Sequence, residues 1–218
     1  MAVSPVRPEL GPSLPQLVGA RRARLALTAA AVVAVLAVVL PRLADGPGGG
    51  AGRVVVAAPV AFNLDAGELQ RAPARGEEAL RLVSAPGDVR QELRATPLRL
   101  EPYAGDPVAA LMSVAQLRAD RLRRELGASL VVRGEGRTRV NEQPGYQLQY
   151  QFRLDGRTAY GRLVLLVPAE KDVLRPREAV ALDLRTQRSP AVPSVFAVGD
   201  NGALKTPLRS FRFGTETP

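Results

Sequence analysis

The chain has 218 residues, enough for one domain of ordinary size and an appendage, and it carries a formal net charge of +9. Its composition is 46% hydrophobic but only 4% aromatic, so we expect a core built mainly from Leu, Val and Ala. Because Cys and His are absent, thiolate and imidazole ligands for metals or haem are excluded, and so is catalysis with histidine as the base. No metal ion and no cofactor are therefore predicted.

The N-terminal part of the chain predicts a membrane anchor. Residues 1–20 contain four prolines and little periodicity, which is typical of a disordered tail. Residues 25–40 are apolar on every side and include no charge, Gly or Pro, unlike an amphipathic surface helix. We therefore predict a transmembrane helix over residues 21–43 rather than a buried helix of a soluble domain. The residues expected to contact the bilayer are Leu25, Leu27, Val32, Val33, Val35, Leu36, Val38, Val39 and Leu40.

This predicted helix is short for a bilayer. At ~1.5 Å per residue the apolar run spans ~24 Å, whereas a hydrocarbon core is ~30 Å thick. Long basic side chains on both flanks would reach the headgroups and make up the difference. The flanking arginines are Arg21, Arg22, Arg24 and Arg42.

The orientation of the anchor follows from its flanking charges. Four arginines precede the apolar run, whereas only Arg42 and Arg53 follow it closely. The positive-inside rule then places the N-terminus in the cytoplasm and the C-terminal domain outside the plasma membrane. A cleaved signal peptide has a similar pattern, but no A-x-A site follows the run, and Arg42 would be the third residue before a cut after Ala44, where it is unfavourable. A single-pass anchor is favoured, and a cleaved, secreted form is the alternative.

The remaining chain predicts one linker and one extracytoplasmic domain. Residues 44–53 are rich in Gly, which is typical of a flexible linker. We expect the domain over residues 54–213 and a frayed end over residues 214–218.

One long helix is predicted over residues 107–126. Asp106 fits an N-cap, Pro107 a first helical residue and Gly127 a terminating residue. Apolar residues recur at helical spacing and form one stripe: Val108, Leu111, Met112, Ala115, Ala119, Leu122 and Leu126. The arginines off this stripe are expected to face water, and these are Arg118, Arg121 and Arg124.

Strands dominate the second half of the domain. Residues 146–154 alternate between apolar and polar side chains, Asp155 and Gly156 predict a hairpin turn, and residues 158–167 return as a partner strand. Residues 161–167 are more continuously apolar, as a central strand would be. Further strands are expected over residues 78–83, 94–100, 129–140 and 179–184. Phe196, Phe211 and Phe213 are expected to pack at the far end of the domain.

These elements predict an α+β fold, with a mostly antiparallel sheet and one long amphipathic helix packed on it. Gly134 and Gly136 flank Glu135 within a predicted strand, and neither a helix nor a lysine follows them as in a phosphate-binding loop. We therefore expect a β-bulge or a turn at these glycines.

The order of elements resembles the PsbP/Mog1-like α/β/α sandwich domains of actinobacterial membrane-anchored extracytoplasmic proteins. The resemblance rests on the helix, on residues 144–150, on residues 156–167 and on a closing strand over residues 208–213. This chain differs in lacking an early aromatic-rich strand with Trp and in having prolines at 190, 193 and 207, which interrupt the expected C-terminal helix. The resemblance implies a noncatalytic binding or assembly module and assigns no functional residue.

The basic composition does not predict a nucleic-acid partner. Five arginines belong to the tail and to the flanks of the apolar run, and the remaining charges are interspersed rather than clustered. A domain outside the cell also meets no genome. A mildly positive surface suits anionic lipid headgroups or acidic wall polymers, so the expected partners are the lipid bilayer, through the anchor, and an envelope protein or lipid.

No residue pattern predicts catalysis. Glu77, Glu78 and Asp183 show no arrangement typical of paired catalytic carboxylates, and we expect them to be solvated or ion-paired. Nothing in the sequence brings Lys205 and Ser210 together as a dyad. The chain is therefore predicted to be no enzyme but a noncatalytic envelope module, and an envelope enzyme using carboxylates is the alternative.

Protease access in intact cells tests the topology. With a tag at each terminus, we expect external protease to remove the C-terminal tag and to leave the N-terminal tag intact until the cells are lysed, because the arginine-rich end stays inside. A C-terminal tag protected in intact cells would contradict this orientation. Release of the domain into the medium would indicate the cleaved form instead.

Overall fold

The computed structural model describes residues 52–101, 103, 105–169 and 178–215. All of them belong to the second of two compact units, Pro47–Pro218. The predicted tail, transmembrane helix and flanking arginines lie outside the described residues. Among the helices that are described, none combines the length and the apolar character that a membrane span requires.

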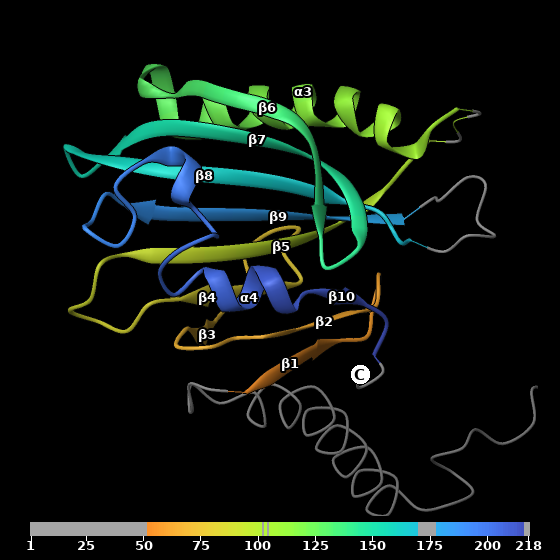
Figure 1. Cartoon of the computed structure of the whole chain (residues 1–218), viewed down its shortest axis with the longest axis horizontal. Coiled ribbons are helices and arrows are strands. Elements are labelled where there is room, and N and C mark those ends of the chain that lie inside the picture. Colours follow the sequence, from red (N-terminus) through yellow and green to blue (C-terminus); the bar gives the residue numbers. More distant parts are fainter. Residues whose placement is uncertain (1–51, 102, 104, 170–177, 216–218) are drawn as a thin grey trace, which may run out of the picture. The chain divides into compact units, whose positions relative to one another are not determined.

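A seven-stranded antiparallel sheet forms the centre of the domain (Figure 1), with the strand order β3-β4-β5-β9-β8-β7-β6. Its strands are β3 (Gln70–Ala72), β4 (Leu80–Val83), β5 (Gln91–Arg99), β6 (Val131–Val140), β7 (Gln143–Leu154), β8 (Arg157–Leu166) and β9 (Glu178–Gln187). The six strands that the sequence predicts here are confirmed, and the short strand β3 was missed. Every neighbouring pair is antiparallel, including β5 with β9, which are far apart in the sequence.

The turn and bulge predictions are confirmed. Asp155 and Gly156 join β7 to β8, and both have a positive φ, 52° and 74°, as a two-residue hairpin turn requires. In β6 the pairing with β7 shifts between Val132 and Gly134, which is a β-bulge at the predicted glycine pair.

The long helix α3 (Pro107–Leu126) has the predicted bounds. Asp106 caps its first turn, because the carboxylate accepts a hydrogen bond of 2.9 Å from the backbone N–H of Val108. Gly127 ends the helix with a φ of 74°. Two side chains differ from the predicted amphipathic pattern, since Met112 is exposed and Arg118 is partly buried on the flank of the helix.

One hydrophobic core lies between α3 and the sheet. It combines the buried helix residues Leu111 and Ala115 with the apolar side of the alternating strand β7. The β7 residues of this core are Tyr146, Leu148, Tyr150 and Phe152. The predicted alternation is therefore confirmed on this face, but the opposite face of β7 is covered as well, and Gln149 is buried there.

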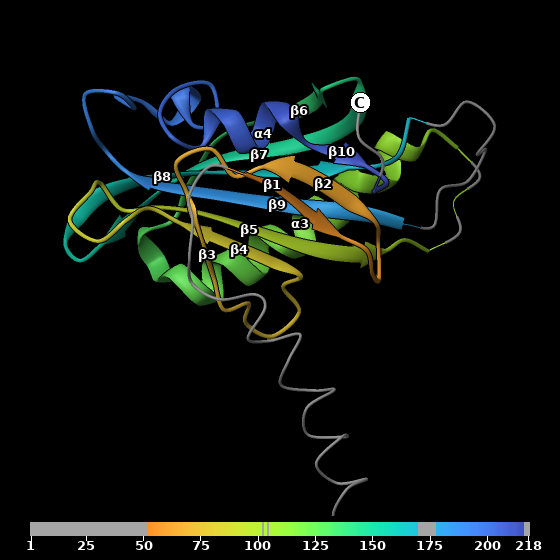
Figure 2. The same cartoon turned by 90° about the horizontal axis from the view of Figure 1, so that it is seen from below.

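A second layer covers the other face of the sheet. It contains a small sheet of strand order β1-β2-β10, with β1 (Arg53–Val56), β2 (Phe62–Asp65) and β10 (Arg212–Phe213), the short helix α4 (Lys205–Ser210) and the 3-10 turn η2 (Val195–Ala197). Figure 2 shows this layer on one side of the large sheet and α3 on the other side. A second core fills the space between this layer and the sheet.

The C-terminal segment corrects three expectations. Of the closing strand predicted over residues 208–213, residues 208–210 belong to the helix α4 and only Arg212–Phe213 is strand. Pro207 is compatible with α4 because it lies in the first turn, where a backbone N–H has no partner within the helix. Phe211 packs as expected against Phe62, with ring centroids 5.6 Å apart, whereas Phe196 is exposed.

The capping contact predicts a measurable difference between two variants. Asp106→Ala removes the acceptor for the N–H of Val108 and is expected to lower the free energy of unfolding by about 1 kcal/mol. Both variants lose the exposed ion pair with Arg137, but Asp106→Ser keeps a capping acceptor, so its loss of stability should be clearly smaller. Urea unfolding of the full chain in non-ionic detergent, followed by circular dichroism, measures both. Equal losses would show that the cap is not the source.

Candidate functional site

The candidate site lies where α3 leaves the sheet uncovered. A helix with side chains is about 10 Å across and strands lie about 4.8 Å apart, so one helix covers about two strands of a seven-stranded sheet. The core under α3 is centred on β7 and β8. On the same face, β4, β5 and the outer part of β9 extend beyond the helix (Figure 1). The charged side chains on these strands include Arg81, Glu92, Arg94, Asp183 and Arg185.

The register of β5 with β9 places opposite charges next to each other. Glu92 pairs with Arg185 and Arg94 pairs with Asp183 across the two strands. Each strand thus carries one acid and one base two residues apart, which puts both on the same face. Direct cross-strand neighbours of opposite charge stabilise an antiparallel pair.

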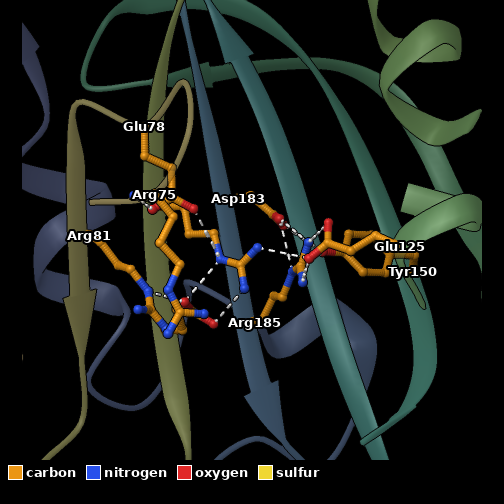
Figure 3. Close-up of polar contacts among 9 residues, drawn as sticks. Arg75, Glu78, Arg81, Glu125, Tyr150, Asp183 and Arg185 are labelled. Atoms are coloured by element: carbon orange, nitrogen blue, oxygen red, sulfur yellow. Dashed lines mark hydrogen bonds and ion pairs between the residues drawn. The ribbon is translucent and has the colours of Figure 1, made fainter. Parts of the chain in front are cut away.

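Arg185 is the centre of this arrangement (Figure 3), and its side chain is only 8% exposed. Its guanidinium donates to both carboxylate oxygens of Glu125 on α3, at 2.8 and 3.0 Å, and lies 2.7 Å from Asp183. Its Nε–H lies 3.2 Å from the hydroxyl oxygen of Tyr150, which in turn donates to Asp183 at 2.5 Å. Although burial alone would lower the pKa of Arg185, its anionic and hydroxyl neighbours raise it.

Arg94 extends the contacts to the edge of the sheet. It donates to Glu92 through Nε, at 2.9 Å, and through Nη2, at 3.0 Å, and its Nη1 donates to Glu125 at 2.9 Å. Arg81 on β4 donates to the same Glu92 at 2.6 Å. Glu125 therefore links Arg94 with Arg185, and ion pairs run from β4 to α3 without interruption. We call the residues Arg81, Glu92, Arg94, Glu125, Tyr150, Asp183 and Arg185 the Arg185 network.

Neighbouring arginines lower the pKa of two carboxylates in the network, those of Glu125 and Glu92. Hydrogen bonds from Arg185 lower the pKa of Glu125 to about 2, against a smaller opposing effect of burial. Burial alone would raise the pKa of Glu92, but the hydrogen bonds from Arg94 and Arg81 outweigh it and the pKa is lowered. The expectation that Glu77, Glu78 and Asp183 are solvated or ion-paired is confirmed, because each forms an ion pair with an arginine.

A pocket of about 350 Å³ opens between the Arg185 network and α3, and we call it the arginine pocket. Arg118 and Arg121 of α3 contribute to its wall, together with Glu77 from the loop before β4. Arg121 donates to Glu77 at 2.7 Å, while Arg118 lies 3.8 Å from the same oxygen. Burial and the neighbouring Arg121 lower the pKa of Arg118, whose side chain is 19% exposed.

A second cavity, of about 660 Å³, follows the same flank of α3 toward the end of β5, and we call it the α3–β5 groove. Its apolar lining includes Leu98, Leu100, Tyr103, Val114 and Leu117. Its arginines are Arg99, Arg118, Arg121 and Arg124. The groove and the arginine pocket share Arg118 and Arg121, so the two cavities adjoin along the helix.

Gly161 on β8 gives Tyr150 room to reach the Arg185 network. The two residues are direct partners in the pairing of β7 with β8. A Cβ added at Gly161 would overlap the phenol ring of Tyr150, so only glycine permits this position of the ring. Burial and the charge of Asp183 raise the pKa of the Tyr150 hydroxyl, which therefore stays protonated and donates its hydrogen.

The structure supports neither a serine nucleophile at Ser210 nor, among the described residues, a metal site. The hydroxyl of Ser210 donates to the carbonyl of Thr206 and accepts from the backbone N–H of Asp65, which are contacts that fix α4 rather than activate a nucleophile. In the described ranges, His, Cys, Asp and Glu form no group of three or more suited to a metal ion.

Sequence reasoning missed both cavities. It treated Arg118 as one of several solvent-facing arginines and gave Asp183 no partner. The available signal was the acid–base alternation in β5 and β9, with Glu92 and Arg94 in one strand and Asp183 and Arg185 in the other. Without the strand register, this signal does not show that the two pairs are neighbours.

These observations define an α+β domain with a long helix on a mostly antiparallel sheet and an ion-paired, partly open sheet face. No protein-family model and no curated protein matches the sequence. Among solved structures the chain is similar to LpqN, involved in cell envelope biogenesis of Mycobacterium tuberculosis, at 13% identity over 76% of this chain and 92% of LpqN, with a TM-score of 0.47.

A second similar structure is PA94 of Pseudomonas aeruginosa, a protein of unknown function described as a putative regulator. It has 14% identity over 66% of this chain and 85% of PA94, with a TM-score of 0.31. At this level of similarity, neither structure indicates a ligand or an activity for the chain. The resemblance to PsbP/Mog1-like domains stays a prediction.

The lowered pKa of Glu125 predicts a pH dependence of stability. Because its pKa falls from an unfolded value of about 4.3 to about 2 on folding, its contribution is complete above about pH 5 and is lost as the pH falls toward 2. Glu125→Gln should lower the free energy of unfolding at pH 7 and reduce its decline between pH 5 and pH 2. Urea unfolding at several pH values measures both effects.

Glu68→Gln provides the matched control, because Glu68 is exposed and lies outside the Arg185 network. This variant should follow the pH profile of the original chain. If Glu125→Gln and the original chain lose stability equally between pH 5 and pH 2, another group is responsible for the decline.

Proposed function

We propose that the chain is a noncatalytic binding module of the cell envelope and that the α3–β5 groove is its ligand site. The observation that carries this proposal is the apolar lining of the groove, where Leu117 is 70% and Tyr103 is 46% exposed. The groove volume of about 660 Å³ lies within the range of about 300–1,000 Å³ that is typical of ligand pockets. A ligand with an apolar part and a negative charge complements this lining.

The location in the envelope rests on the sequence of the N-terminal part. Residues 25–40 and their flanking arginines favour a single-pass anchor with the domain outside the plasma membrane. A cleaved and secreted form would present the same groove. The binding role of the domain is therefore independent of how the N-terminal part is processed.

The state of the carboxylates supports binding over catalysis. A carboxyl group that acts as an acid or base near neutral pH needs a pKa raised toward 7. The pKa values of Glu77, Glu92 and Glu125 are shifted in the opposite direction by arginines that donate hydrogen bonds to them. Such carboxylates hold arginines in place and are poor proton donors.

Site-specific photo-crosslinking in intact cells tests this proposal. A photoreactive amino acid at position 117 of the full chain lies in the groove, while the same amino acid at position 116 lies on the same helix, is exposed and does not line the groove. We expect position 117 to give a discrete adduct with an envelope component, identified by mass spectrometry, and position 116 to give none. The same pattern of adducts at both positions would contradict a ligand site in the groove.

A hydrolytic or transfer activity of the purified chain that is abolished by Glu125→Gln or Asp183→Asn would contradict the noncatalytic role. Circular dichroism of these variants shows whether a lost activity reflects unfolding. An activity lost while the fold is retained would favour the carboxylate enzyme.

A further inference from the structure

Arginines with unequal ion pairing line the two cavities beside α3. In and beside the Arg185 network, Arg94 contacts three carboxylates, of Glu78, Glu92 and Glu125, and Arg185 contacts two. Along the groove, no ion pair of Arg99 or Arg124 with a carboxylate occurs among the residues that the structure describes. The excess positive charge therefore lies at the groove rather than in the network.

Among the described residues, the two arginines shared by both cavities form ion pairs with the same carboxylate, that of Glu77. Glu77 lies 2.7 Å from Arg121 and 3.8 Å from Arg118, so one negative charge serves two guanidiniums. The partly buried Arg118 has lost part of its hydration, which makes a further anion at this point favourable. Guanidinium groups bind phosphate well, because their planar array of donors matches its oxygens.

The apolar part of the groove starts beside these arginines. Val114 and Leu117 lie within one helical turn of Arg118, and Leu98 and Leu100 of β5 also line the groove. A position for an anion thus adjoins an apolar channel along the helix. Glu101 is the carboxylate in the described lining, so the groove carries a positive excess.

We infer that the α3–β5 groove binds a single-chain phospholipid, with its acyl chain against Leu98, Val114 and Leu117 and its phosphate at Arg118 and Arg121. This inference rests on the proposed binding function and adds the chemical class of the ligand. A lipid fits better than a free phosphate, because the lining is apolar on the side away from the arginines. An apolar peptide explains the channel but not the excess of guanidinium groups.

A fluorescent reporter in the groove tests this inference. The chain contains no Cys, so Ser113→Cys gives one labelling site on the groove wall for an environment-sensitive dye. The labelled full chain is placed in phosphatidylcholine nanodiscs and titrated with lysophosphatidylglycerol, which is anionic, or with lysophosphatidylcholine of the same chain length. We expect a blue shift of the dye emission at lower concentrations of the anionic lipid, and no such response from a dye at Gln116→Cys.

Variants of the arginines and of Leu117 distinguish the headgroup contact from the acyl-chain contact. Arg118→Gln and Arg121→Gln are expected to weaken lysophosphatidylglycerol binding about threefold to tenfold, as loss of a charge-assisted contact does. Arg123→Gln is the matched control for Arg121, because both arginines lie on α3, are about half exposed and are ion-paired, but Arg123 does not line the groove, and its change should leave binding unchanged. Leu117→Gln should weaken the binding of both lipids, since each buried methylene strengthens binding about fourfold.

The possible outcomes separate this inference from the proposed function. If both lipids bind equally and the arginine variants have no effect, the phosphate contact is contradicted. If inorganic phosphate alone gives an equal blue shift, the assignment of the ligand as a lipid is contradicted. If no acyl probe binds while position 117 crosslinks to an envelope protein, the inference fails and the proposed function stands. If no probe binds and no adduct forms, both fail.

Discussion

The limited width of α3 underlies the architecture of the candidate site. The helix covers one face of the sheet at β7 and β8 but not at β4 and β5, whose buried apolar side chains pack in the core on the opposite face. The uncovered part of the face that bears α3 meets water and carries charges, because exposed apolar area of that size is disfavoured in a soluble domain. The boundary between the two parts runs through Arg185, which contacts the helix through Glu125 and the core through Tyr150.

Burial makes this boundary sensitive to any change in its charges. A nearly buried guanidinium is tolerated only when its donors meet acceptors, and removal of one partner from such a pair costs several kcal/mol. Arg185 meets Asp183, Glu125 and the hydroxyl of Tyr150, and Gly161 permits the ring to approach. The network therefore fixes the position of α3 over the sheet, and with it the width of the groove beside the helix.

The Arg185 network, in which the charges balance, and the α3–β5 groove, which has an excess of positive charge, have different roles. Where arginines and carboxylates balance each other, the contacts serve the fold and leave little attraction for a ligand. The groove differs because it combines an excess of guanidinium groups with exposed Leu117 and Tyr103. Its position on the flank of a rigid helix also keeps its lining in place without a ligand, which lowers the entropy lost on binding.

The sequence by itself determined the local elements, because their signals are local: Asp106 and Gly127 bound the helix, and Asp155 and Gly156 form the turn between β7 and β8. It also carries the anchor prediction, which concerns residues outside the described part of the chain. Tertiary structure alone decided that Glu125 of α3 meets Arg94 and Arg185 of the sheet and that Arg118 lies between two cavities. Such contacts depend on strand register and helix placement, which no local pattern specifies.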